Sequence, residues 1–145
     1  MPESPADHLD ALRQQLDSGF GKMIGLEFDE LGPDRVTARW TIRPELHQPF
    51  GIVHGGVYCA VVESVASTAA AVWLGDRGNV VGVNNNTDFI RAVRDGVLTA
   101  EATPVHRGRT QQIWIVTIID GSDRLIARGQ VRLQNIQDTG TIGSS

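Results

Sequence analysis

Apolar and polar residues alternate along most of this chain, and one long apolar segment interrupts the alternation. The alternating runs cover residues 24–31 and 35–42 and return after residue 79, whereas residues 55–74 are small and apolar almost throughout. Successive side chains of a strand point to opposite faces, so alternation predicts strands with one buried face. The apolar segment predicts a buried helix that ends near Gly75, a residue suited to a C-terminal cap.

The first two alternating runs predict a β-hairpin, because the Gly-Pro-Asp sequence at residues 32–34 is a turn signal. Before the hairpin, three leucines at helical spacing predict a short amphipathic helix over residues 6–17. The glycine-rich residues 19–25 fit neither a Walker A loop nor a dinucleotide fingerprint, so we expect a turn into the first strand. The second strand is expected to bury one apolar face, made of Val36, Ala38, Trp40 and Ile42.

Four further strands are expected after the helix, over residues 80–93, 97–106, 109–120 and 124–135. Short turn segments separate these runs. Strands joined by short turns pair as antiparallel neighbours, so we expect a four-stranded meander. The polar residues 137–145 contain Gly and Ser and predict a flexible tail.

This order of elements predicts an α+β fold in which a curved antiparallel sheet of about six strands wraps one long central helix. Small helix residues such as Ala66 and Ala69 permit the strands to approach closely. A length of 145 residues fits one domain. We assign residues 1–18 to an N-terminal lead and short helix, 19–136 to the domain, and 137–145 to the tail.

Composition and charge exclude several classes of protein. The formal net charge of −4 argues against a nucleic-acid partner, which usually requires a basic surface. Cys59 is the only cysteine, and His47 and His54 are not at metal-ligand spacing, so we expect no disulfide within the chain and no metal. Neither a signal peptide nor an uninterrupted apolar stretch of membrane length is visible, so we expect a cytoplasmic location and no membrane partner.

Glu63 is the single charged residue of the apolar segment and therefore its chemical anomaly. Desolvating a lone carboxylate is costly unless a partner or a function holds it there. Such a carboxylate can act as a general base or as a nucleophile, and buried carboxylates concentrate at functional sites. The alternative is a carboxylate held only by hydrogen bonds between the helix and a strand.

The GIVHGG segment at residues 51–56, followed by Glu63 on a long helix and then by four strands, resembles the hotdog-fold thioesterases of the phenylacetate-degradation and 4-hydroxybenzoyl-coenzyme A type. The resemblance covers about residues 20–136. It implies a hotdog fold and the hydrolysis of an aromatic or short- to medium-chain acyl-coenzyme A, with no metal or organic cofactor. It also implies a homodimer with active sites at the subunit interface, often paired into a dimer of dimers.

The start of the long helix is the second candidate for chemistry. Its first N–H groups have no partner within the helix, and they can polarise a thioester carbonyl and stabilise an oxyanion. Gly55 and Gly56 would allow the substrate to approach closely. The alternative is that the two glycines only form a tight start to the helix.

The distance between these two groups predicts how the site is built. About eight residues separate Gly55 from Glu63, which is roughly 12 Å at 1.5 Å per residue. One bound carbonyl cannot touch both groups. We therefore expect a two-fold dimer with antiparallel helices, in which Glu63 of one chain faces Gly55 of the other.

The resemblance assigns supporting roles to three further residues. Ser67 lies one turn beyond Glu63 and replaces a threonine whose hydroxyl orients the carboxylate or the water in the aromatic thioesterase. Gln48 matches a glutamine that contacts the thioester. His54 either shapes the loop through a backbone hydrogen bond, which we favour, or contacts the acyl carbonyl.

Coenzyme A carries phosphates, so an acidic protein needs a local basic patch. Arg91 and Thr110 match family positions that contact the nucleotide, although arginines also protect sheet edges. We expect one or more of the asparagines at residues 84–86 to line the pantetheine tunnel, and we count Asn86 among the substrate-binding residues. The expected phosphate-binding turn consists of His106, Arg107, Gly108, Arg109 and Thr110.

Two other functions are open for this pattern. A hotdog hydratase or dehydratase acts on acyl thioesters, but its families pair a histidine and an acid in a different arrangement. A non-catalytic acyl-coenzyme A binding module usually carries an attached output domain, for which we expect no room before Gly19. Release of free thiol from an acyl-coenzyme A separates hydrolysis from both alternatives.

Overall fold

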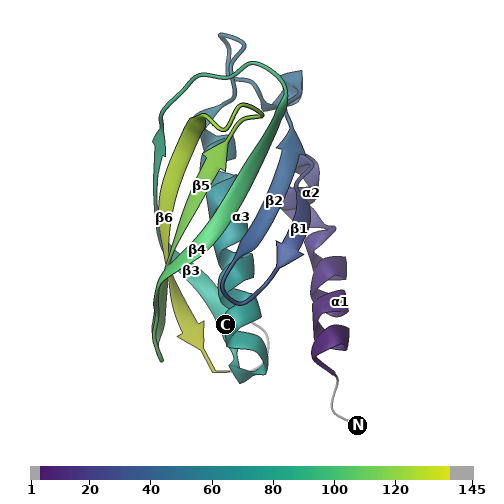
Figure 1. Cartoon of the computed structure of the whole chain (residues 1–145), viewed down its shortest axis with the longest axis vertical. Helices are drawn as coiled ribbons and strands as arrows, with labels where there is room; N and C mark the ends of the chain where they lie inside the picture. The colour runs from purple at the N-terminus through teal and green to yellow at the C-terminus, as the bar shows by residue number, and fades with distance from the viewer. Residues whose placement is uncertain (1–3, 138–145) are drawn as a thin grey trace, which may run out of the picture.

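The protein is a single long helix wrapped by a six-stranded sheet, as the computed structural model of residues 4–137 shows (Figure 1). The helix, α3 (Gly55–Leu74), contacts all six strands. It ends at Gly75, which has a positive φ of 61° and donates its N–H to Ala71 O. The predicted α+β hotdog architecture is confirmed. The predicted tail lies outside the described residues, apart from Gln137.

The six strands form one antiparallel sheet in the order β1-β2-β4-β5-β6-β3. β1 and β2 form the predicted hairpin at one edge, and β3 forms the other edge. The bounds of the strands are β1 Glu27–Leu31, β2 Val36–Thr41, β3 Asn79–Phe89, β4 Val97–Arg107, β5 Gln111–Ile119 and β6 Leu125–Ile136.

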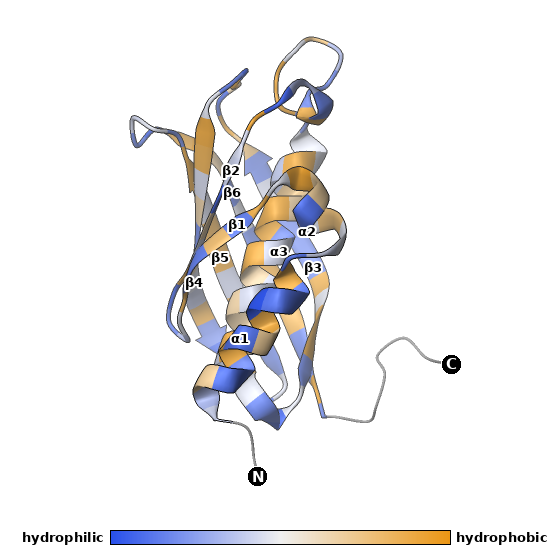
Figure 2. Cartoon of the chain, turned by 90° about the vertical axis from the view of Figure 1, so that its right-hand side faces the viewer, coloured by the Kyte–Doolittle hydropathy of each residue, from blue (hydrophilic) through white to orange (hydrophobic). Residues whose placement is uncertain are grey.

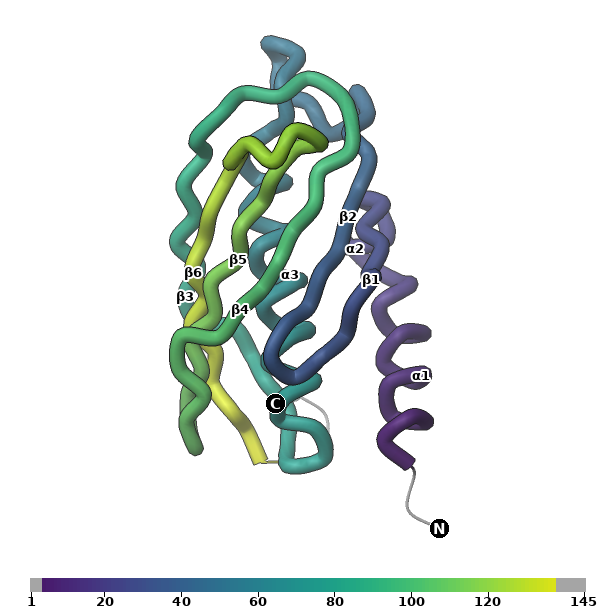
Figure 3. The backbone as a smooth tube through the Cα atoms, in the orientation of Figure 1, coloured from purple at the N-terminus to yellow at the C-terminus, as the bar shows by residue number. Residues whose placement is uncertain are grey.

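The predicted meander is wrong at one connection, because β3 pairs with β6 rather than with β4. Residues 90–96 are not a hairpin turn but a crossover, and Figure 3 shows it arching over one end of the sheet. β3 and β4 are three strand spacings apart, roughly 14 Å. Seven residues span up to roughly 23 Å, so this segment is long enough to cross. The crossover places β3 at an edge.

Two helices precede the hairpin. α1 (Pro5–Leu16) confirms the predicted amphipathic helix and begins at a capping box between Ser4 and Asp7. Residues 19–25 differ from the expected turn, because Gly19–Ile24 forms the short helix α2. The buried Ile24 anchors α2, and Gly25 ends it in the left-handed conformation at φ 87°. Two short 3-10 helices, Pro44–Leu46 and Gly75–Arg77, complete the helical elements of the described chain.

The core lies between α3 and the inner face of the sheet. Along β5 every second residue from Gln112 to Ile118 is buried. The four apolar residues expected on the buried face of the second strand are also buried, three of them in β2 and Ile42 directly after it. The hydrophobic colour in Figure 2 runs along α3. The segment Gly55–Arg77 is long and apolar enough to cross a membrane, but 56% of that apolar stretch is buried. It is the core helix of this domain.

Close contact between α3 and β6 depends on Gly129. A β-carbon at this position would lie 2.6 Å from Val62 Cγ1 and 2.5 Å from Thr87 Oγ1. We expect Gly129→Ala to lower the free energy of unfolding by about 1–3 kcal/mol, because the helix and sheet must move apart. Chemical denaturation measures this change.

Gly121 is the matched control, because a β-carbon there has no heavy atom within 4 Å. Gly121→Ala should change stability by roughly 0.5 kcal/mol or less. Equal effects of the two substitutions would contradict the close helix-to-sheet contact as the cause.

Candidate active site

The loop before α3 positions the start of the helix. His54 is the N-cap, and its Nδ1 accepts a hydrogen bond from Gly56 N–H at 2.8 Å. His54 N–H donates to Leu46 O, and Val57 N–H donates to His54 O, both at 2.9 Å. These contacts support the loop-shaping role for His54. Within residues 4–137, the N–H of Gly55 has no acceptor and is available to a ligand.

Gln48 stabilises the same loop from its other end. Its side-chain Oε1 accepts a hydrogen bond from Phe50 N–H, and its own N–H donates to Ile52 O at 2.8 Å. Arg94 Nη1 donates to Gly51 O at 3.2 Å and holds the tip of the loop against the crossover. These hydrogen bonds fix the shape of the loop.

Three predicted site residues line one open pocket at the start of α3. Gln48, Gly55 and Arg91 meet there with Tyr58 and Phe89, around a volume of about 300 Å³. We call it the helix-start pocket. A β-carbon on Gly55 would collide with the Phe89 ring, so glycine is required here for close packing. Packing against Phe89 is a structural reason for glycine at this position, beside the expected close approach of a substrate.

Glu63 lies in a second hollow, between α3 and β3, which we call the Glu63 cleft. Its other lining residues include Cys59, Gly82 and Asn85. Asn85 Nδ2 donates to Glu63 Oε2 at 3.1 Å and to Cys59 O at 3.0 Å. Glu63 is half-buried rather than enclosed, because β3 is an edge strand and leaves this side of the helix open.

The sequence analysis missed Gly82 of the Glu63 cleft and did not select among the three asparagines. A β-carbon at Gly82 would collide with Glu63 Oε1, so this glycine makes room for the carboxylate. Of the three asparagines it is Asn85 that contacts Glu63, whereas Asn86, counted among the substrate-binding residues, is exposed and makes no hydrogen bond to the carboxylate. Neighbouring strand residues point to opposite faces, so the sequence alone could not select between them. The run of three asparagines was the only signal.

Ser67 is half-buried one turn beyond Glu63. In the part of the chain that the structure describes, its hydroxyl makes no hydrogen bond, either to Glu63 or to another group. The neighbouring Thr68 instead donates to Ser64 O at 2.7 Å. Among the described residues of one protomer, Ser67 therefore does not orient the carboxylate by a direct hydrogen bond, and its expected role toward the water stays a prediction.

The turn at residues 106–110 lies at the opposite end of α3 from Arg91 (Figure 1). Arg107 Nη1 donates to Asp34 Oδ1 at 2.6 Å and to Pro33 O at 2.8 Å. Arg107 thus joins two turns of the sheet, which is a structural role. One protomer does not bring the two expected halves of the phosphate site together.

Asn135 holds the rest of that turn. Its Nδ2 donates to Gly108 O at 3.0 Å and to Arg109 O at 3.2 Å, and its backbone N–H donates to Thr110 O. The guanidinium of Arg109 is exposed and has no ion-pair partner among residues 4–137. His106 is also exposed. These two side chains are available to a ligand.

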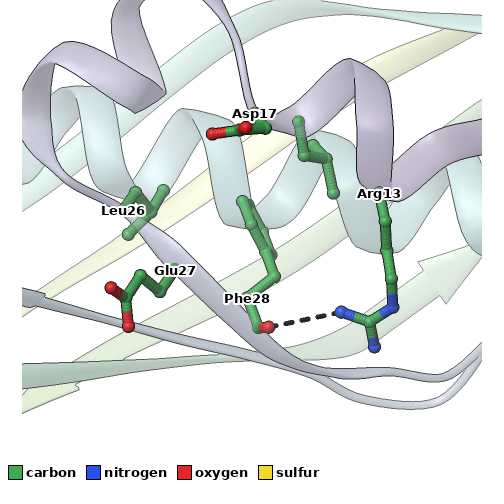
Figure 4. A pocket seen from close by; sticks show the side chains of 6 residues that line it. Arg13, Asp17, Leu26, Glu27 and Phe28 are labelled. Carbon is green, nitrogen blue, oxygen red and sulfur yellow. Dashed lines mark hydrogen bonds between the residues drawn. The ribbon is translucent and has the colours of Figure 1, made fainter.

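A further pocket, between α1 and β1, lies apart from these residues (Figure 4). Arg13 Nη1 donates to Phe28 O across it at 3.4 Å, so the pocket belongs to the docking of α1. No predicted site residue lines it. The described residues also contain no cluster of three or more His, Cys, Asp or Glu side chains arranged to hold a metal.

Comparison with known proteins then decides the family. The profile of the thioesterase superfamily matches residues 50–127, which include the helix-start loop, Glu63 and β3. The chain belongs to the thioesterase superfamily. This assignment confirms the resemblance on which the expected fold and enzyme class rest, and it makes the protein a thioester hydrolase.

Individual relatives of this thioesterase cover most of its length. The Mycobacterium tuberculosis protein Rv1847 is 57% identical over 121 residues, 81% of this chain and 86% of that one. The solved structure of that protein has a TM-score of 0.81 and covers 83% of this chain and 98% of that one. The 1,4-dihydroxy-2-naphthoyl-CoA hydrolase of Escherichia coli is 32% identical over 74% of this chain and 81% of that one. The Haemophilus influenzae thioesterase HI1161 has a TM-score of 0.84 at 29% identity, covering 98% and 96% of the two chains.

The His54 cap gives the first test of the site. We expect His54→Ala to lower the free energy of unfolding by about 1 kcal/mol, because Gly56 N–H loses its acceptor. His54→Asn supplies another capping oxygen and should recover most of that loss. Both values are measured by chemical denaturation, beside thioester hydrolysis.

The two variants also separate the two roles considered for His54. If the histidine only shapes the loop, His54→Asn recovers hydrolysis together with stability. Recovery of stability without recovery of hydrolysis would contradict this role and assign the imidazole to the reacting carbonyl.

Proposed function

We propose that this thioesterase hydrolyses acyl-coenzyme A, with Glu63 from one chain and Gly55 N–H from its partner acting on the same carbonyl. One observation carries the proposal. A single helix presents an unpaired N–H in the helix-start pocket and a carboxylate in the Glu63 cleft. These are the two groups that thioester hydrolysis requires, and they line separate hollows of the protomer.

The edge strand β3 supports a two-chain site. Its outer edge pairs with no other strand of the described chain, and Val83 in its centre is 48% exposed. A long edge strand with exposed apolar residues favours pairing with another strand. Antiparallel pairing of two β3 strands about a two-fold axis sets the two α3 helices antiparallel. The Glu63 cleft of one chain then faces the helix-start pocket of the other.

The reaction follows from the positions of these groups. Gly55 N–H donates a hydrogen bond to the carbonyl oxygen, and together with the dipole of α3 it stabilises the negative charge that develops there. Glu63 either removes a proton from the water that attacks the carbonyl carbon or attacks that carbon itself. The carbon–sulfur bond breaks and the thiolate takes a proton. The first route gives the free acid directly, whereas in the second route a water must still hydrolyse the mixed anhydride formed with Glu63. Asn85 and Gly82 hold the carboxylate in place.

Two observations support coenzyme A as the thiol part of the substrate: an exposed arginine at the helix-start pocket and the similarity to a coenzyme A thioester hydrolase. Arg91 is exposed at the helix-start pocket, where a guanidinium can bind phosphate oxygens. In the proposed dimer the turn at residues 106–110, with Arg109, belongs to the partner chain. The Escherichia coli relative is named for hydrolysis of a coenzyme A thioester. We also infer a dimer of dimers in the cytoplasm, without a metal or organic cofactor.

A shared site can be tested with two inactive variants. We expect Glu63→Ala to lower kcat by about a hundredfold or more, the usual effect of removing a general base. Gly55→Val should inactivate by forcing the Phe89 ring away from the helix start. Thiol release from a panel of aromatic, short- and medium-chain acyl-coenzyme A esters measures both effects.

Co-expression of the two variants then distinguishes a site shared between two chains from a site within one chain. If Glu63 and Gly55 act across the interface, each mixed dimer has one intact site, and about a quarter of wild-type activity returns for random pairing. If both groups act within one chain, no activity returns. Each variant alone must remain a folded dimer by light scattering. Near wild-type hydrolysis by Glu63→Ala would refute the proposed mechanism.

Nucleotide binding is tested separately at Arg91. We expect Arg91→Ala to raise KM for an acyl-coenzyme A about five- to tenfold, because a charge-assisted hydrogen bond to phosphate is lost. The matching acyl N-acetylcysteamine thioester has no nucleotide, and its KM should not change. Arg39→Ala, on β2 next to the opposite edge strand β1, is the control for loss of a surface arginine. Equal effects on both thioesters would contradict a nucleotide role.

A further inference from the structure

The turn at residues 108–110 is held by a single residue at the end of β6. Asn135 Nδ2 donates to Gly108 O at 3.0 Å and to Arg109 O at 3.2 Å, and Asn135 N–H donates to Thr110 O at 2.8 Å. The carbonyl groups of three consecutive turn residues are therefore occupied by one asparagine, and they point toward β6.

The amide groups of the same turn are left without such partners. Gly108 N–H donates to Gln111 O across the turn, but within residues 4–137 the N–H groups of Arg109 and Thr110 have no acceptor. Both residues are exposed. Successive N–H groups of a turn that have no partner form a concavity that binds anions.

Basic side chains surround this turn. A hollow of about 340 Å³ beside it is lined by Arg77, Arg107 and Arg109 and by the Trp73 ring, and none of its lining residues in the described chain is acidic. Arg107 is paired with Asp34, whereas Arg77 and Arg109 form no ion pair among residues 4–137. In a protein with a formal net charge of −4, this is a local concentration of positive charge suited to phosphate.

A chain of hydrogen bonds from the core decides which way the Asn135 amide faces. Trp114 Nε1 can only donate, and it donates to Gln112 Oε1 at 2.8 Å, so the fully buried Gln112 presents its NH2 group to its other neighbours. That group donates to Asn135 Oδ1 at 2.8 Å and to Ala70 O of α3 at 3.3 Å. Asn135 can then offer only its own NH2 group to the turn, and this group holds carbonyls rather than amides.

We propose that Asn135 is a positioning residue for coenzyme A, because it holds the carbonyl groups of residues 108–110 and leaves the N–H groups of Arg109 and Thr110 free to donate to a phosphate. This inference rests on the proposed hydrolysis of acyl-coenzyme A and adds a backbone contribution to its phosphate-binding turn. Trp114 and Gln112 act through Asn135 by fixing the direction of its amide. The Arg109 guanidinium supplies positive charge from the same turn.

The kinetic test compares Asn135→Ala with Gln134→Ala. Asn135→Ala removes the donor to two turn carbonyls, so we expect KM for an acyl-coenzyme A to rise about five- to tenfold with little change in kcat, because hydrogen bonds to a charged phosphate are weakened. KM for the matching acyl N-acetylcysteamine thioester, which has no nucleotide, should not change. Gln134→Ala removes a neighbouring amide that bonds Gln111 and the Asn135 carbonyl but no residue of 108–110, and both KM values should stay the same.

Arg109→Ala tests the turn independently of Asn135. If Arg109→Ala raises KM for the acyl-coenzyme A and Asn135→Ala does not, the turn binds phosphate without this positioning, and the inference is overturned while hydrolysis stands. Equal rises of KM for the two thioesters in Asn135→Ala show a general structural role and overturn it as well. An effect of Gln134→Ala as large as that of Asn135→Ala has the same consequence.

A second readout depends neither on turnover nor on the folding of a variant. Adenosine 3′,5′-bisphosphate, which carries ribose phosphates but no thioester, is titrated into the isotope-labelled wild type. We expect the amide protons of Arg109 and Thr110 to shift downfield, whereas Ser122 N–H, already bonded to Asp120 Oδ1 in the next turn, should not shift. No shift at Arg109 and Thr110 would overturn the inference even if hydrolysis is confirmed. These shifts without thiol release from any acyl-coenzyme A would refute hydrolysis but support a turn whose amides bind phosphate.

Discussion

The close packing of one helix inside one curved sheet is the constraint on which the rest of this structure depends. No other element of the described chain is long enough to form a second layer, so α3 supplies nearly all the surface against which the strands are buried. Ala66, Ala69 and Gly129 permit this approach because they place little or no side chain between helix and sheet. The same constraint leaves the β3 side of α3 open, and Glu63 lies there half-buried.

The helix also determines how the chemistry is distributed. Its N-terminus supplies N–H groups and a positive dipole end at Gly55, and a carboxylate two turns later is too distant to act on the same carbonyl. The two hollows that the structure shows agree with this separation. A second copy of the chain with its α3 antiparallel to the first would bring Glu63 of one chain close to Gly55 of the other. The exposed edge of β3 is the surface through which the two copies can pair.

Much of the candidate site could be predicted because its signals are local. The helix start, the His54 cap and Glu63 all lie within one stretch of ten residues, where a glycine pair and a lone charge stand out from apolar neighbours. Gly82, Asn85 and Asn135 could not be predicted in the same way. Gly82 matters only because Glu63 faces it across the cleft, and Asn85 only because its side chain points to the helix. Asn135 reads as the end of an ordinary strand until its side chain is found bonded to carbonyls of the turn between β4 and β5.

The sequence by itself determined the existence and nearly the bounds of the strands, and also the long helix and its terminal glycine, because side-chain periodicity and capping are properties of neighbouring residues. Only the tertiary structure decided that β3 crosses over to pair with β6, that Arg107 binds the β1–β2 turn, and that Asn85 rather than Asn86 contacts Glu63. These outcomes depend on which distant segments bury each other's surfaces. Local alternation is the same whichever neighbour a strand has, and so it carries no information about that choice.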